Sequence, residues 1–180
     1  MLALRHIRIT VSNPVPRNHR TIMASIATLE RIPAAKLRDL LLAEKADDPK
    51  VAVVDVRDDD YIGGHIKGAL NVPSQQLDAR MPTLVRQLQD KPTVIFHCAL
   101  SQQRGPGAAL RYIRERDEVL KKAKDKEDAA ASSEPAASPL AEQKVYVLDR
   151  GFVGWQEAYG EDENLTEGYR KELWKDGYWG

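Results

Sequence analysis

Uninterrupted apolar runs mark three places in the chain, at residues 51–54, 93–96 and 145–148. A strand that is half-buried alternates apolar and polar positions, whereas an unbroken apolar run is typical of a strand covered on both faces in a parallel sheet. Residues 28–31 form a weaker candidate strand, and residues 69–72 form another. The pattern therefore predicts five short strands.

Between the strands, apolar residues recur at helical spacing. Pro33 opens a helical stretch over residues 34–45, whose apolar face holds Leu37, Leu40 and Leu41. Two more helical patterns cover residues 75–88, with Pro82 as a candidate break, and residues 108–116. Strands that alternate with helices predict an α/β fold with a central, mostly parallel five-stranded sheet and helices on both faces.

Length and charge limit the class of protein. A chain of 180 residues suffices for one domain with a proper core, but not for two of ordinary size. The 27 Lys and Arg residues balance 27 Asp and Glu residues, so no basic field favours nucleic acid or an anionic membrane as a partner. No apolar run approaches the roughly 20 residues that span a bilayer. We expect a soluble protein of unspecified oligomeric state.

Three segments fall outside the predicted core. Residues 1–22 are rich in Arg and lack acidic residues, which resembles a mitochondrial presequence, unless translation starts at Met23. We expect the protein in the cytoplasm or nucleus, or in mitochondria if the presequence is used. Residues 121–143 almost lack aromatic and β-branched residues and are predicted to be a disordered insertion. Residues 161–180 form a tail whose rings we expect to pack onto the domain rather than bind a partner, namely Tyr169, Trp174, Tyr178 and Trp179.

The single cysteine, Cys98, lies between a predicted strand and a predicted helix. A lone cysteine cannot form an intramolecular disulfide and fits a reducing compartment. Ligands of open parallel sheets bind beyond the carboxyl ends of the strands, where the amides of a helix N-terminus are unpaired. We therefore predict an oxyanion-binding loop after the cysteine, formed by Ala99, Leu100, Ser101, Gln102, Gln103 and Arg104.

Arg104 closes this loop, and its planar guanidinium matches two oxygens of a tetrahedral oxyanion. Gly105 permits a sharp turn, and Pro106 suits the first turn of a helix. The loop amides, the helix terminus and the arginine all favour the nucleophilic thiolate of Cys98. A buried structural cysteine is the alternative, but it would require all these features to coincide by chance. Cys98 and Arg104 are thus the predicted catalytic residues.

These residues resemble the signature of the phosphatase branch of the rhodanese superfamily, which includes the M-phase inducer phosphatases, the fungal-type arsenate reductases and related small tyrosine phosphatases. The shared pattern is His-Cys, five residues, then Arg-Gly-Pro. Residues 53–73 resemble the superfamily's upstream motif, and residues 147–155 resemble its last strand and glycine-rich turn. The likeness covers roughly residues 27–160 and implies a rhodanese-like catalytic domain.

Several residues of these motifs are expected to support the loop rather than to react. Side chains that cap and cross-link turns are expected at Asp55, Arg57, His65 and Asn71. His97 is expected to orient the loop by hydrogen bonds, and Gly105 to permit its sharp exit turn. No general acid is recognisable, and the acidic run at residues 58–60 is only a distant candidate. The histidines and the cysteine are not spaced as metal ligands, so we expect no metal.

The resemblance also ranks the activities. Sulfurtransferases of the superfamily have a loop one residue shorter than the seven residues found here, which favours phosphate or arsenate. Ala99 and Gln103 replace acidic residues of the M-phase inducers, which argues against a cyclin-dependent kinase as substrate.

The favoured function is a cofactor-independent phosphatase of the tyrosine or dual-specificity type, acting on a phosphorylated protein or a small oxyanion through a phosphocysteine. The first alternative is an arsenate reductase, in which glutathione or glutaredoxin would supply the second thiol because the chain has only one. Further alternatives are a thiosulfate-type sulfurtransferase and a non-enzymatic interaction module.

Overall fold

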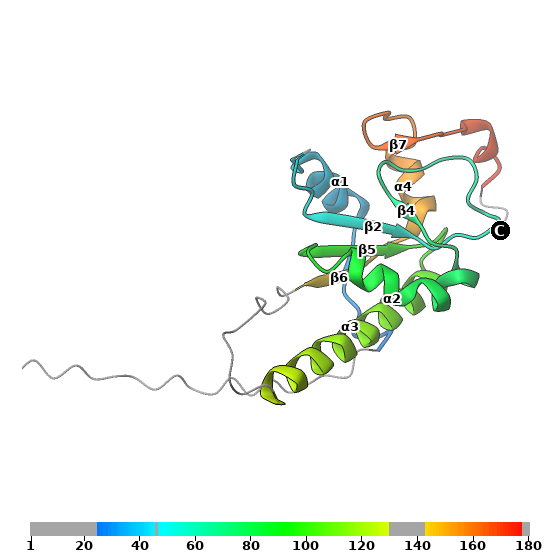
Figure 1. Cartoon of the computed structure of the whole chain (residues 1–180). Coiled ribbons are helices and arrows are strands. Elements are labelled where there is room, and N and C mark those ends of the chain that lie inside the picture. Colours follow the sequence, from blue (N-terminus) through cyan, green and yellow to red (C-terminus); the bar gives the residue numbers. More distant parts are fainter. Residues whose placement is uncertain (1–24, 46, 130–142, 178–180) are drawn as a thin grey trace, which may run out of the picture.

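A central sheet of five parallel strands organises the chain in the computed structural model, which describes residues 25–45, 47–129 and 143–177 (Figure 1). Across the sheet the strands are β1 (Arg31–Ile32), β6 (Lys144–Leu148), β5 (Thr93–His97), β2 (Val51–Asp55) and β4 (Leu70–Asn71). The predicted sheet is confirmed. The first strand lies slightly later than expected, because Arg31 and Ile32 are the residues that pair with the end of β6.

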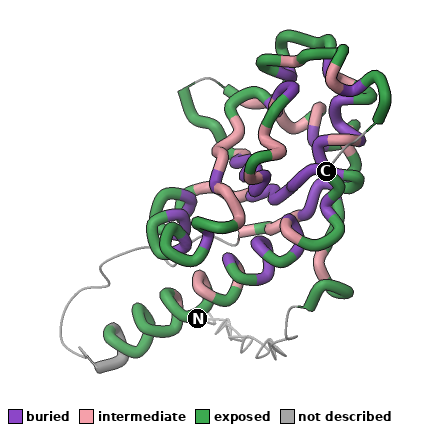
Figure 2. Tube along the Cα trace, turned by 90° about the vertical axis from the view of Figure 1, so that its right-hand side faces the viewer, coloured by how far each residue is buried: buried purple, intermediate pink, exposed green. Residues whose placement is uncertain are grey.

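Helices cover both faces of the sheet. One face packs against α2 (Leu77–Gln87) and α3 (Arg104–Ala129), and the other packs against α1 (Ala34–Leu42) and α4 (Gly151–Tyr159). Side chains of a single strand enter both layers: on β5, Phe96 joins the first core cluster and Ile95 joins the second. This two-sided burial explains the uninterrupted apolar runs, and Figure 2 shows the buried residues gathered in the interior of the domain.

Two helices differ from the sequence prediction: α2 is unbroken, and α3 is longer than expected. Pro82 lies inside α2 without ending it, because the loss of one backbone hydrogen bond is offset by the burial of Met81, Leu84 and Val85 in the core. The prediction of disorder over residues 121–143 is wrong for residues 121–129, which continue α3 as its outer end. Ala, Lys and Glu favour helix there, and Lys122 pairs with Glu118 one turn earlier.

The C-terminal segment belongs to the domain instead of forming a separate tail after residue 160. Its strand β7 (Thr166–Glu167) pairs with β3 (His65–Ile66) in an antiparallel ribbon. Leu165 and Trp174 are buried, and the Trp174 indole donates a hydrogen bond of 2.8 Å to the Gly63 carbonyl. The predicted packing of Tyr169 and Trp174 onto the domain is confirmed. The presequence hypothesis for residues 1–22, the rest of the insertion and the last two rings, Tyr178 and Trp179, lie outside the described residues.

Two short 3₁₀ helices complete the described elements, at Ser74–Gln76 (η1) and Lys171–Leu173 (η2). In the part of the chain that the structure describes, no helix combines the length and apolar character that crossing a bilayer requires.

Candidate active site

Cys98 lies in a seven-residue loop between β5 and α3, at the carboxyl edge of the sheet. Gly105 brings the first turn of α3 against the end of β5: a Cβ atom at this position would lie 3.3 Å from the Cys98 nitrogen and from two backbone atoms of His97. A side chain there would push the helix away from the strand. Pro106 occupies the first turn of α3, as the sequence predicts.

The loop turns one of its amides toward the sulfur. Ser101 adopts a left-handed conformation with φ of 53°, and its N–H donates to Cys98 Sγ over 3.2 Å. Arg31 of β1 holds the outer side of this turn, because its Nη2 donates to the Ser101 carbonyl over 3.1 Å. Within the predicted cradle, Ala99 and Ser101 are buried, whereas the solvent-facing positions are Leu100, Gln102 and Gln103.

The N-terminus of α4 binds the loop from outside. The Phe152 N–H donates to the Cys98 carbonyl and the Val153 N–H to the Ala99 carbonyl, each over 2.9 Å. A peptide group is planar, so a carbonyl that points outward directs the N–H of the following residue inward. The amides of Ala99 and Leu100 are thereby turned toward the inside of the loop.

Gly151 makes this contact possible. Its φ is 54°, and a Cβ atom would lie 2.4 Å from the Cys98 oxygen and 2.5 Å from the Ala99 oxygen. No L-residue with a side chain fits between α4 and the loop without moving one of them.

Arg104 is held by two carboxylates from the segment after β2. Its Nη1 donates to Asp58 over 3.0 Å and to Asp60 over 2.7 Å, and its Nη2 donates to Asp60 over 2.5 Å. The hydrogen bonds that Arg104 donates to Asp60, together with the one to Asp58, raise the pKa of Arg104 despite partial burial. The structure thus brings two residues of the acidic run next to the predicted catalytic arginine, and it leaves Asp59 exposed.

Asp58 is a carboxylate at neutral pH. Partial burial alone would raise its pKa, but hydrogen bonds from the Ser74 hydroxyl, the Gln75 amide and Arg104 outweigh burial and lower the pKa below its ordinary value of 3.8. An ionised carboxylate cannot donate a proton, so Asp58 does not qualify as a general acid.

A second aspartate and arginine pair lies beneath the loop. Asp55 and Arg57 are fully buried and share bidentate hydrogen bonds of 2.7 to 3.1 Å. The Arg57 guanidinium also donates to the Gly64 carbonyl and lies 4.1 Å from the ring centroid of Phe152. Asn71 donates from Nδ2 to the Asp55 and Arg57 carbonyls, both over 3.1 Å.

Two histidines among the predicted supporting residues occupy different places. His97 is fully buried, with Nδ1 3.3 Å from the Cys98 carbonyl oxygen and Nε2 3.7 Å from Asp55. Burial lowers the pKa of His97, with Asp55 opposing the effect, so the ring is neutral at physiological pH. His65 instead lies on β3, where it stacks on Tyr61 and reaches Glu167 of β7 over 3.2 Å. It holds the β3–β7 ribbon rather than the loop.

The fold coincides with that of a known family. Residues 39–158 match the family model of the rhodanese-like domain. The chain belongs to the rhodanese-like family. The resemblance expected from the sequence, and the fold it implies, are confirmed.

Relatives of this rhodanese-like protein carry two kinds of name. The Cdc25-like phosphatase YCH1 of Saccharomyces cerevisiae is 36% identical over 134 residues, which cover 68% of this chain and 77% of the relative. Arsenate reductase 2.1 of Oryza sativa subsp. japonica is 32% identical over 150 residues, 83% of each chain. The crystal structure of S. cerevisiae Ygr203w, described as a homolog of single-domain rhodanese and the Cdc25 phosphatase catalytic domain, superposes with a TM-score of 0.64 at 32% identity, over 83% of this chain and 94% of that one.

Some contacts of this rhodanese-like site carry no signal in the sequence. Arg31 stands 70 positions before the carbonyl it binds, and Asp60 stands 44 positions before Arg104. Gly151 was visible as part of a glycine-rich turn, but its contact with the loop depends on how α4 docks. Among the described residues, no group of three or more His, Cys, Asp and Glu side chains is placed to hold a metal ion.

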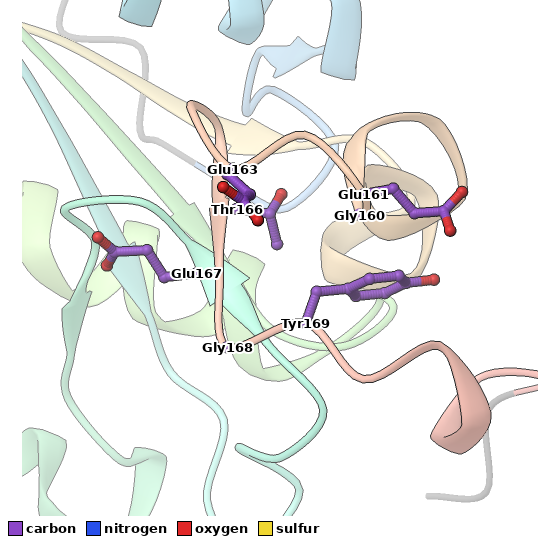
Figure 3. A pocket seen from close by; sticks show the side chains of 7 residues that line it. All are labelled: Gly160, Glu161, Glu163, Thr166, Glu167, Gly168 and Tyr169. Atoms are coloured by element: carbon purple, nitrogen blue, oxygen red, sulfur yellow. The ribbon is translucent and has the colours of Figure 1, made fainter.

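A hollow elsewhere on the domain is acidic and separate from the loop. It lies beside the β3–β7 ribbon and is lined by Gly160, Glu161, Glu163, Thr166, Glu167, Gly168 and Tyr169 (Figure 3). The carboxylates of Glu161 and Glu167 point away from each other, so they do not converge on one ligand.

Proposed function

We propose that this rhodanese-like protein is a cysteine-dependent phosphatase of the protein tyrosine or dual-specificity type, acting through a phosphocysteine at Cys98. The observation that carries the proposal is the loop itself: its amides turn inward around the sulfur, α4 binds its carbonyls from outside, and Arg104 stands at its end. Relatives named phosphatases support the same reading.

In the proposed reaction the Cys98 thiolate attacks phosphorus and the bond from phosphorus to the ester oxygen breaks in line. The inward amides and the Arg104 guanidinium stabilise charge on the three transferring oxygens. Water then attacks the phosphocysteine, the sulfur–phosphorus bond breaks, and inorganic phosphate and the Cys98 thiolate are released. The sequence of steps uses no metal and no redox partner.

Whether a side chain can protonate the leaving group determines which phosphate esters react fastest. Asp58 is ionised and His97 is neutral and buried, so neither donates a proton to a departing oxygen. Substrates whose leaving group is stable as an anion are then the faster ones, which favours phosphotyrosine and other aryl phosphates over phosphoserine. A steep dependence of turnover on leaving-group acidity is the expected consequence.

Arsenate reduction is the second candidate, and the relative named arsenate reductase 2.1 favours it. Cys98 would attack arsenic, the bond from arsenic to one hydroxyl oxygen would break, and that hydroxyl would leave as water with a proton taken from solvent. A glutathione thiol would then attack, so that two sulfurs are oxidised to a disulfide while arsenic gains two electrons and leaves as arsenite. A second thiol, from glutathione or glutaredoxin, would reduce that disulfide.

One comparison of two proteins separates the candidates. Wild type and Cys98→Ser are assayed in chelator on an aryl phosphate, on arsenate with glutathione and glutaredoxin, and on thiosulfate with cyanide. Phosphate release by wild type that falls at least about 10⁴-fold in Cys98→Ser is the expected result. Turnover of arsenate or thiosulfate alone would replace the phosphatase by a reductase or a sulfurtransferase, and inactivity on all three would favour an interaction module.

A further inference from the structure

The hydrogen bonds of Arg104 use only part of its guanidinium. The group has five N–H donors. Both Nη1 hydrogens go to the two carboxylates, one to Asp58 and one to Asp60, and one Nη2 hydrogen goes to Asp60. The Nε–H and the second Nη2–H of Arg104 take no part in these contacts.

The two remaining donors lie side by side on one edge of the guanidinium plane. Two parallel N–H groups on such an edge match two oxygens of a phosphate or arsenate. The carboxylate of Asp60 therefore binds the end of the guanidinium formed by Nη1 and Nη2. The edge formed by Nε and Nη2, which suits an oxyanion, remains available.

The carboxylates are themselves fixed before any ligand arrives. Asp58 accepts from the Ser74 hydroxyl over 2.6 Å and from the Gln75 amide over 3.1 Å. The Asp58 N–H donates to Asp60 over 2.9 Å, which ties the two residues together. Both side chains are less than one-fifth exposed. Arg104 thus meets a rigid acceptor pair rather than two mobile surface acids.

We propose that Asp58 and Asp60 are positioning residues, which hold the guanidinium of Arg104 so that its Nε edge meets the oxyanion bound over Cys98. The proposal rests on the proposed function of the loop as an oxyanion site. The side chain of Arg104 is about one-third exposed, so without partners it would adopt many rotamers. The carboxylates select one rotamer in the free protein, and the loss of side-chain entropy therefore does not add to the activation free energy.

The same carboxylates could instead mask Arg104, and masking predicts the opposite effect on the reaction rate. Two carboxylates beside one guanidinium leave an excess negative charge, which by charge alone repels an anionic substrate. If they only masked Arg104, their removal would speed the reaction. If they position it, removal slows the reaction although the site becomes less negative.

The test compares single variants at the three positions of the acidic run on an aryl phosphate. Asp60→Asn is expected to lower kcat by about 10- to 100-fold, which is less than the fall in kcat expected when a hydrogen-bond donor to the transition state is itself removed. Asp58→Asn is expected to lower kcat by less than Asp60→Asn. Asp59→Asn is the matched control, because Asp59 is an exposed neighbour of equal charge, and its kcat should equal that of wild type. Asp60→Glu should recover part of the loss.

A double-variant cycle shows whether Asp60 acts through Arg104. In an Arg104→Lys background, Asp60→Asn should add little further loss, because the group it positions is gone. A full additional loss in that background, or a kcat of Asp60→Asn equal to or above that of wild type, would overturn the proposal.

Tungstate binding separates this proposal from the phosphatase assignment. Calorimetry on Cys98→Ser, with and without Asp60→Asn, measures oxyanion binding without turnover. Weaker tungstate binding upon loss of a negative charge supports positioning even if no phosphate ester is hydrolysed. Equal or tighter binding, or no tungstate binding to Cys98→Ser, overturns it.

Discussion

Two aspartate and arginine clusters take their aspartates from residues 55–60, the lower one buried at the end of β2 and the upper one around Arg104 at the end of the cysteine loop. In the lower cluster Asp55 and Arg57 are fully buried. In the upper cluster the Asp58 and Asp60 side chains are 15% and 17% exposed, and Arg104 is 30% exposed. The same chemical groups therefore meet very different surroundings.

The difference in burial separates support from reactivity. Arg57 is enclosed by Asp55, a backbone carbonyl and aromatic rings, so it supports the fold at the end of β2 and is out of reach of solvent. Arg104 keeps a free edge at the surface, where an oxyanion can reach it. Residue type alone does not distinguish these roles, and neither does the number of unpaired donors, because the buried Nη1 of Arg57 has no hydrogen-bond partner among the described residues. Access to solvent distinguishes them.

Removing the buried arginine should have the largest effect on stability. Arg57→Met leaves the Asp55 carboxylate buried without its partner, and breaking such a pair costs about 3–5 kcal/mol. Urea unfolding followed by circular dichroism measures the change. Arg38→Met, which breaks an exposed pair with Asp39, should leave the unfolding midpoint in place. An unchanged midpoint for Arg57→Met would remove the distinction between the two clusters.

Arg104→Lys should reverse the pattern, with a large loss of activity and little loss of stability. A lysine keeps the charge but not the planar pair of donors, so kcat on an aryl phosphate should fall roughly 10²- to 10³-fold. The free energy of unfolding should change by about 1 kcal/mol or less, because the ion pair is partly exposed. A lysine variant as active as wild type would show that only charge matters in the upper cluster.

Gly151→Ala tests whether the N-terminus of α4, which binds two loop carbonyls, turns the loop amides inward. The added Cβ atom meets two loop carbonyls at a left-handed φ, so we expect a destabilisation of about 1–3 kcal/mol and weaker tungstate binding. Gly107→Ala in α3 is the control, since a Cβ atom there meets nothing within 4 Å and alanine favours helix. Equal stability of both alanine variants would contradict the role of α4.

The smallest expected effect is the pH dependence contributed by His97. Because the pKa of His97 is lowered in the folded protein, its contribution is fully present above the unfolded value of 6.5 and is lost as the pH falls below it. One such group changes the free energy of unfolding by at most about 1.4 kcal/mol per pH unit. Urea unfolding between about pH 7.5 and 5.5 should therefore show a shallower decline for His97→Gln than for wild type. Parallel curves would contradict a neutral, buried His97.

The sequence predicted what depends on neighbouring residues. Unbroken apolar runs predicted the strands, and the spacing from Cys98 to Arg104 predicted the loop, because both are local patterns. Contacts across the fold were not predictable in this way: Asp60 reaches Arg104 from 44 positions away, and α4 covers the loop only after the sheet has formed. The outer end of α3 was misjudged because a composition poor in core residues also suits an exposed helix.

The most direct test of the central claim is to trap the covalent intermediate. Wild type is mixed with an aryl phosphate, quenched in acid during turnover and digested, and the peptide that contains Cys98 is examined by mass spectrometry. We predict the added mass of one phosphoryl group on Cys98 in wild type and none in Cys98→Ser, which should also be inactive. Steady phosphate release without a modified Cys98, together with an active Cys98→Ser, would contradict the account.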